Sequence, residues 1–136
     1  MLFRSLPGLK TFVTLSPIPG LTRWLKAEGR GFDPQDGKAM AALAAHYLLH
    51  AKRPDGQPVD PVARFHLGNG AMVQAVHAEA DVSENGLRQS GGVMVNYLYD
   101  LNRVEKYHDR YADSFEVTAA QGVKSLANTR EKVAAG

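Results

Sequence analysis

The stretch Leu9–Gly20, LKTFVTLSPIPG, decides the fold more than any other part of this sequence. Leu9–Leu15 is rich in β-branched and aromatic side chains, which is typical of a buried β-strand. Ser16-Pro17-Ile18-Pro19-Gly20 ends that strand, because a proline pushes the residue before it out of the helical region. We therefore expect a strand followed by a rigid turn, with the Ser16 hydroxyl held firmly at the strand end.

Helical patterns follow this turn. Leu21–Ala27 is expected to form a short helix, and Lys38–Lys52 has apolar residues at helical spacing together with several alanines. A third helix is expected to begin at Asp60, a good N-cap, with Pro61 at its first position. The turn-formers Gly68-Asn69-Gly70 would end this helix.

The remaining patterns predict two more strands and a polar tail. Ala71–Ala78 and Val93–Leu101 are expected to be strands, and Asp81–Gly92 between them is polar and rich in turn residues. The segment from residue 102 to 136 is charged, with a short helix expected near Val123–Val133. This order predicts an α/β or α+β domain with a mixed sheet and flanking helices, its core in residues 9–101.

Composition narrows the possible functions. The 136 residues suit one domain, and 44% apolar with 22% charged residues is close to the globular average. The net charge of +2 comes from scattered basic residues, so no nucleic-acid partner is expected. No apolar run is long enough to span a membrane, and no secretory signal is visible. The absence of cysteine excludes thiolate chemistry and suits a reducing compartment, so we expect a cytoplasmic protein.

Histidines at two places in the sequence are candidates for a catalytic or metal-binding role. In Phe65-His66-Leu67-Gly68-Asn69-Gly70, a histidine lies near the end of a predicted helix and is followed by turn-formers. From this pattern alone, a capping or hydrogen-bonded polar role is the main alternative to catalysis. His46 and His50 have a spacing that can bind zinc, but no carboxylate lies between them and no third ligand is evident. We expect a solvated helix face there and no metal.

Three stretches together resemble a known family. They are TFVTLSPIPG at Thr11–Gly20, with Trp24 following, DPVARFHLGNGA at Asp60–Ala71, and SGGVMVNYLYDL at Ser90–Leu101. In this order they resemble the C-terminal part of malonyl-CoA decarboxylase. The resemblance implies a partial acetyltransferase-like (GNAT-like) fold. It also implies conversion of malonyl-CoA to acetyl-CoA and carbon dioxide, without a metal or organic cofactor.

The resemblance also implies roles for individual residues. Ser16 and His66 match the family's catalytic serine and histidine, and Tyr99 matches an active-site tyrosine. Asn69 and Gly70 are weaker candidates for binding the substrate through their backbone, because helix capping already explains them. Further candidates for contacting a CoA phosphate are Arg64, Arg88 and Lys52.

Chemistry supports roles for these residue types. Decarboxylation of a β-keto thioester places negative charge on the thioester oxygen, so it needs donors aimed at that oxygen and a proton source for the carbon. Histidine titrates near neutral pH and can supply a proton. In the last turn of a helix, the helix dipole would favour its imidazolium form. The bland alternatives are a turn serine at Ser16 and a half-buried strand tyrosine at Tyr99.

The chain also departs from the family pattern. The family's N-terminal helical domain and the first half of its catalytic domain have no counterpart. The interval from Ser16 to His66 is short, as in family members with a compact connecting segment. His77-Ala78 stands where the family has an Asn-Trp pair, and Glu79 replaces an apolar residue. We therefore expect a homo-oligomer, or association with the upstream half of the enzyme. The alternative is an inactive truncated remnant, or a non-catalytic partner subunit of an intact decarboxylase.

Overall fold

The computed structural model describes the backbone of residues 10–135 and the side chains of residues 10–128. Along the chain, the elements are β1 (Thr11–Pro17), α1 (Leu21–Ala27), α2 (Gly37–His50), α3 (Pro61–Gly68), β2 (Met72–His77), α4 (Glu84–Ser90), β3 (Met94–Asp100), α5 (Val104–Ser114) and α6 (Gln121–Ala135). The described part of the chain contains no helix that is both long and apolar enough to cross a membrane.

The three strands form one sheet in the order β1-β3-β2, so the last strand in sequence lies in the middle. Both neighbouring pairs are antiparallel. The α/β class with flanking helices is confirmed, but the described strands form an antiparallel sheet, where a mixed one was expected. The connection between β2 and β3 begins and ends at the same end of the sheet, because the Ala80 and Asp81 N–H groups both donate to the Gly92 carbonyl oxygen. β3 therefore runs back antiparallel to β2. Among the described residues, the parallel pairing is limited to an isolated bridge between Val73 and Ala119.

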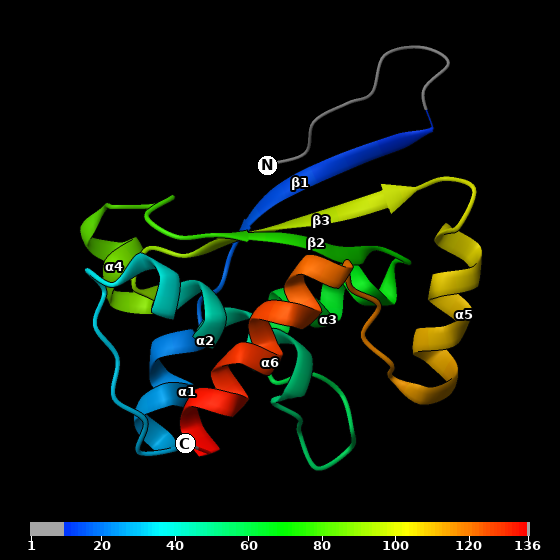
Figure 1. The fold of residues 1–136 in the computed structure, drawn as a ribbon. Coiled ribbons are helices and arrows are strands. Elements are labelled where there is room, and N and C mark those ends of the chain that lie inside the picture. The colour runs from blue at the N-terminus through cyan, green and yellow to red at the C-terminus, as the bar shows by residue number, and fades with distance from the viewer. Residues whose placement is uncertain (1–9, 136) are drawn as a thin grey trace.

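Helices cover one side of the sheet, and Figure 1 shows α1, α2, α3 and α6 beneath it. Side chains alternate along a strand, so β3 turns Val95, Tyr97 and Tyr99 toward the helices, and all three are buried. Its other side chains, such as Leu98, are half-buried on the opposite face. Among the described residues, no helix packs on that opposite face.

The second half of the chain has two features that were not predicted from the sequence. The polar segment 81–92 contains helix α4, because Ser83 caps it by accepting a hydrogen bond from the Gly86 N–H. Beyond residue 101, the core includes Tyr111, Ala119, Val123 and Ala127, where a charged tail was expected. The helix expected near Val123–Val133 is confirmed by α6. Helix α6 packs along α2 and buries Val123 and Ala127. The apolar residues of α6 are few and widely spaced among charged ones, so the composition of this segment indicates an exposed tail.

The N-terminus of α3 is fixed from inside the core. As predicted, Asp60 is its N-cap and accepts a hydrogen bond from the Ala63 N–H at 2.9 Å, with Pro61 at the first position. The Asp60 side chain is fully buried, and the Tyr47 hydroxyl of α2 donates to it at 3.3 Å. This pairing joins α2 to α3 and thereby sets the position of the histidine at the other end of α3.

Candidate active site

The site forms where α3 packs beneath β1 and β3. The register pairs Phe12 with Tyr99 and Ser16 with Val95, so Phe12, Ser16 and Tyr99 share the helix-covered face of the sheet. His66 lies in the last turn of α3, as expected. The structure therefore brings together the three residues that the family resemblance singled out, from segments 50 and 33 residues apart.

A chain of hydrogen bonds joins these side chains. The Ser16 hydroxyl lies 3.3 Å from Nε2 of His66, and the Tyr99 hydroxyl lies 2.6 Å from Nδ1 of the same ring. On the other side of Ser16, the Thr14 hydroxyl lies at 3.1 Å. The imidazole thus sits between two hydroxyl groups, an arrangement in which it can accept a proton at one nitrogen and release one at the other.

Aromatic rings hold the imidazole and the phenol in place. The Tyr97 ring stacks beneath the His66 ring with centroids 4.4 Å apart and planes 21° apart. Phe12 stacks on Tyr99 in the same way, at 4.8 Å and 12°. Stacked contacts restrict the rotation of both rings, so their nitrogen and oxygen atoms stay in hydrogen-bonding position.

The hydrogen-bonded chain opens into a cavity of about 410 Å³, lined by Phe12, Thr14, Ser16, Phe65, His66, Asn69 and Tyr99. Phe65 is 64% exposed, an unusual state for a large apolar side chain, and it stands at this cavity. A polar floor with an apolar rim is typical of pockets that bind small molecules. A second cavity of about 420 Å³, lined by Lys52 and Phe115 among others, lies away from His66 and contains no comparable hydrogen-bonded chain.

The charge state of His66 differs from the prediction. Burial lowers the pKa of His66 below its usual value, because the charged ring would lose water. Within the described part of the chain, no carboxylate forms an ion pair with this ring. The expected imidazolium is therefore wrong: the loss of hydration outweighs the dipole of an eight-residue helix, and the resting ring is neutral at pH 7.

Asn69 and Gly70 have different environments. Asn69 lines the cavity, and its side chain hydrogen-bonds to Tyr99, which partly offsets the burial that raises the Tyr99 pKa. Gly70 has φ +90°, and a Cβ there would lie 2.3 Å from the Val104 carbonyl oxygen. Backbone conformation and close packing therefore account for Gly70 without a ligand.

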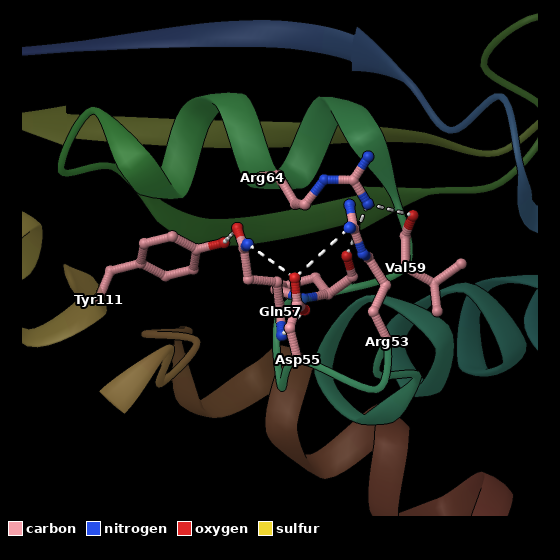
Figure 2. A network of polar contacts seen from close by, with 7 residues as sticks. Arg53, Asp55, Gln57, Val59, Arg64 and Tyr111 are labelled. Carbon is pink, nitrogen blue, oxygen red and sulfur yellow. Dashed lines mark hydrogen bonds and ion pairs between the residues drawn. The ribbon is translucent and has the colours of Figure 1, made fainter. Parts of the chain in front are cut away.

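Arg64 has a structural role. Its guanidinium donates to the carbonyl oxygens of Pro58 and Val59 at 3.0 and 2.9 Å. Figure 2 shows it turned toward this loop, beside Gln57, whose amide oxygen accepts a hydrogen bond from Tyr111 at 3.2 Å. Together these bonds fasten the α2–α3 loop to α5.

The other two candidates for a CoA phosphate, Arg88 and Lys52, do not line the His66 cavity. The two histidines of α2 also lie apart from it. His46 is 8% exposed, so the expectation of a solvated face is wrong for this residue, whereas His50 is exposed. Their rings lie 5.1 Å apart, and no group of three possible metal ligands occurs among the described residues.

Three contributors to the site were missed by the sequence reasoning: Phe12, Thr14 and Tyr97. Thr14 and Phe12 lie two and four residues before Ser16 on β1. Tyr97 lies two residues before Tyr99 on β3. Strand alternation places such residues on the same face, so the signal was present once the strands were recognised. It could not reveal which of these neighbours touch the histidine.

Fold and site together define a class: an α/β domain with a partly buried hydroxyl–imidazole–hydroxyl centre beneath an antiparallel sheet. The family model of the malonyl-CoA decarboxylase C-terminal domain matches residues 1–36 and 33–135. This match covers nearly the whole sequence, so the chain belongs to the malonyl-CoA decarboxylase family.

Individual relatives agree. The mitochondrial malonyl-CoA decarboxylase of Mus musculus is 28% identical over 90% of this chain and 34% of its own length. The crystal structure of malonyl-CoA decarboxylase from Rhodopseudomonas palustris is 40% identical, with a TM-score of 0.78 over 89% of this chain and 34% of that one. The enzyme from Agrobacterium vitis is also 40% identical, with a TM-score of 0.76 over 90% and 37%. The chain therefore spans about a third of the length of the relatives it matches.

The matches also bear on the short interval between Ser16 and His66. The two segments of the family model meet at residues 33–36, in the loop between α1 and α2. The alignment with the mouse enzyme spans 167 positions, more than the 136 residues of this chain, so the relative carries additional residues inside the matched region.

Proposed function

We propose that this chain supplies the catalytic centre of a malonyl-CoA decarboxylase, acting together with the upstream part of such an enzyme. The observation that carries the proposal is the hydrogen-bonded chain Ser16–His66–Tyr99 at the wall of a cavity. The substrate follows from the relatives, which are malonyl-CoA decarboxylases. Because the chain spans a third of their length, we assign binding of the CoA moiety chiefly to the upstream part.

The proposed reaction needs one electron-pair acceptor and one proton. The bond between the carboxylate carbon and the methylene carbon breaks, carbon dioxide leaves, and the electron pair moves through the methylene carbon onto the thioester oxygen as an enolate. Hydroxyl donors aimed at that oxygen stabilise the enolate. Ser16 and Tyr99 line the cavity, and we assign this role to their hydroxyl groups. Protonation of the methylene carbon then gives the acetyl thioester.

The proton travels through a neutral imidazole in this proposal. The hydroxyl at one ring nitrogen gives its proton to the methylene carbon and takes the proton of that nitrogen. The other ring nitrogen takes the proton of the second hydroxyl as solvent in the cavity reprotonates that hydroxyl, so no stable imidazolium is required. The lowered pKa of His66 suits this role, because a neutral ring can both accept and donate. Solvent restores the proton at the end of the cycle. The proposal uses no metal and no organic cofactor.

The competing proposal is a non-catalytic chain, either a remnant or a partner subunit of an intact decarboxylase. It draws support from the short coverage of the relatives and from His77-Ala78, which stands where the family resemblance implies an Asn-Trp pair. Both proposals include association, with a further copy or with the upstream part. We keep a cytoplasmic location as part of the proposal, on the ground that the sequence lacks cysteine.

Release of carbon dioxide from malonyl-CoA separates the two proposals. It is measured with the chain alone and after adding the upstream part of the Rhodopseudomonas palustris relative. We expect release in the combined sample, and a loss of at least a hundredfold on His66→Ala, about 2.7 kcal/mol of transition-state stabilisation. His108→Ala changes an exposed histidine of α5 and is expected to leave the rate unchanged. No release in either sample would favour the non-catalytic chain.

A further inference from the structure

The hydrogen-bonded chain has a fourth member that the proposed mechanism does not use. Thr14 and Ser16 are two residues apart on β1, so both point to the helix-covered face, and each is 4% exposed. Their hydroxyl oxygens lie 3.1 Å apart. We propose that Thr14 is a positioning residue that acts through Ser16, completing a relay Thr14–Ser16–His66–Tyr99. Only the expected effect of Thr14 on the rate of decarboxylation rests on the proposed function.

Counting protons explains why the relay needs Thr14. A serine hydroxyl has one proton to donate and two lone pairs that accept. The structure gives the Ser16 hydroxyl two side-chain partners, the Thr14 hydroxyl and Nε2 of His66. When Nε2 of His66 carries no proton, the Ser16 hydroxyl donates its proton to that nitrogen and accepts the proton of the Thr14 hydroxyl.

Protonation of the ring reverses both bonds. Nε2 then carries a proton and donates it to the Ser16 oxygen, so the Ser16 proton must turn to another acceptor. The Thr14 oxygen is that acceptor, because a hydroxyl can donate in one state and accept in the other. Without it, a buried hydroxyl would be left unsatisfied each time the ring takes up a proton at Nε2, and such a group is costly. Thr14 therefore keeps both states of the relay accessible.

Other groups around His66 do not replace Thr14. From β3, Tyr99 bonds to Nδ1 and Tyr97 stacks on the ring face, while Phe65 of α3 lies edge-on to it. Tyr97 and Tyr99 are the titratable side chains in contact, and burial raises the pKa of both, so they remain uncharged at neutral pH. The side-chain partners of Ser16 among the described residues are Thr14 and His66, and these two bonds set its orientation.

The test is Thr14→Val, which replaces the hydroxyl with a methyl group of similar size. In the full chain, followed by NMR of the ¹⁵N-labelled histidines, we expect the His66 pKa to fall by about half to one pH unit, because the protonated state alone loses its acceptor. Thr14→Ser restores the hydroxyl and should restore the pKa. Thr22→Val is the matched control, since Thr22 is also a buried threonine but donates to the Arg88 and Gln89 carbonyl groups.

A double-mutant cycle isolates the path through Ser16. In a Ser16→Ala background, Thr14→Val should no longer change the His66 pKa, because the connecting hydroxyl is absent. In the decarboxylase assay, Thr14→Val should lower kcat about tenfold with KM unchanged, and Thr14→Ser should recover it.

Several outcomes would overturn the role of Thr14. These are an unchanged His66 pKa in Thr14→Val, an equal shift in Thr22→Val, or a shift that persists in the Ser16→Ala background. If the Thr14→Val variant does not fold, Thr14→Ala replaces it in the test, and the His66 pKa is again expected to fall. A fall in pKa in a sample that releases no carbon dioxide would instead leave the relay standing and count against decarboxylation.

Discussion

Tyr97 places a hydroxyl in the core beneath His66, where it is fully buried and has no hydrogen-bond partner among the described residues. A buried hydroxyl without a partner destabilises a protein relative to a hydrogen atom in the same place. The hydroxyl has lost its hydrogen bonds to water and has gained none within the protein. The ring itself is needed, since it stacks on the imidazole. At this residue, shape and polarity therefore have opposite effects on stability.

Tyr97→Phe tests this opposition. We expect the free energy of unfolding to stay constant or rise by about 1 kcal/mol, because the stacked ring remains and the unsatisfied hydroxyl is lost. Tyr99→Phe, on the same strand face, removes a hydroxyl that bonds to His66 and should lower it by about 1 kcal/mol. Urea denaturation measures both variants. A larger loss for Tyr97→Phe than for Tyr99→Phe would show that the Tyr97 hydroxyl has a partner.

Asp60 makes stability depend on pH. Burial raises the pKa of Asp60 above its usual 3.8, although its hydrogen bonds act in the opposite direction. A carboxyl whose pKa is higher in the folded state than in the unfolded state stabilises the fold while it is protonated. That contribution is lost as the pH rises through the folded value. Ionisation of Asp60 therefore lowers the free energy of unfolding as the pH rises above about 4.

Asp60→Asn removes this charge and keeps an oxygen that can cap α3. The difference in free energy of unfolding between the variant and the parent chain should increase in the variant's favour from about pH 4 to pH 7. Chemical denaturation at a series of pH values measures this difference. The lowered pKa of His66 makes the free energy of unfolding change with pH in the opposite direction, but this contribution is the same in both chains and cancels. A difference that does not change with pH would contradict the raised pKa.

At the scale of elements, the junction between α3 and β2 fixes the site. Asn69 ends the helix, and Gly70 turns the chain with a positive φ while its α-carbon lies against the first turn of α5. The next residues enter β2 beside β3. Displacement of this junction would move the last turn of α3, and with it His66, relative to Ser16 and Tyr99.

Two glycines near this junction form a matched pair for mutation. Gly70→Ala should lower the free energy of unfolding by more than about 2 kcal/mol, since the added Cβ meets a backbone carbonyl 2.3 Å away at a φ that alanine disfavours. Gly68→Ala places a Cβ with nothing within 4 Å at the end of α3. It should be neutral or stabilising by up to about 1 kcal/mol. Thermal unfolding followed by circular dichroism compares the two, and similar melting temperatures would contradict the packing at Gly70.

At the scale of the whole molecule, the sheet has one face under helices and one face without a described helix (Figure 1). The second face carries apolar side chains of all three strands, with Leu98 of β3 in register with Val13 of β1 and Met72 of β2. A sheet in an α/β protein is commonly covered on both faces. Under the proposed function, the upstream part of the enzyme covers this face.

Leu98→Lys tests that arrangement. A charge in the middle of the apolar face should weaken binding to the upstream part of a relative at least tenfold, because the ammonium group would lose its water on association. Leu87→Lys makes the same exchange at a partly exposed position of α4 and should leave binding unchanged. Analytical ultracentrifugation measures the complex, with circular dichroism to check that both variants fold. Equal affinities would place the upstream part elsewhere.

The sequence by itself determined the strands and most of the helices. These follow from local rules: alternation for β1 and β3, capping by Asp60 for α3, and the proline turn after Ser16. The family resemblance added Ser16, His66 and Tyr99, which the structure brings into contact.

Only the tertiary structure decided the features that depend on contacts between distant segments. Burial among β1, β3 and α3 makes His66 neutral, although its place at a helix end predicted the opposite. Packing of α6 against α2 moves part of the charged tail into the core. Thr14 and Tyr97 gain their roles from the face that α3 covers, since alternation gives the side of a strand but not what lies against it. Loss of hydration and close packing are sums over neighbours that the order of residues does not reveal.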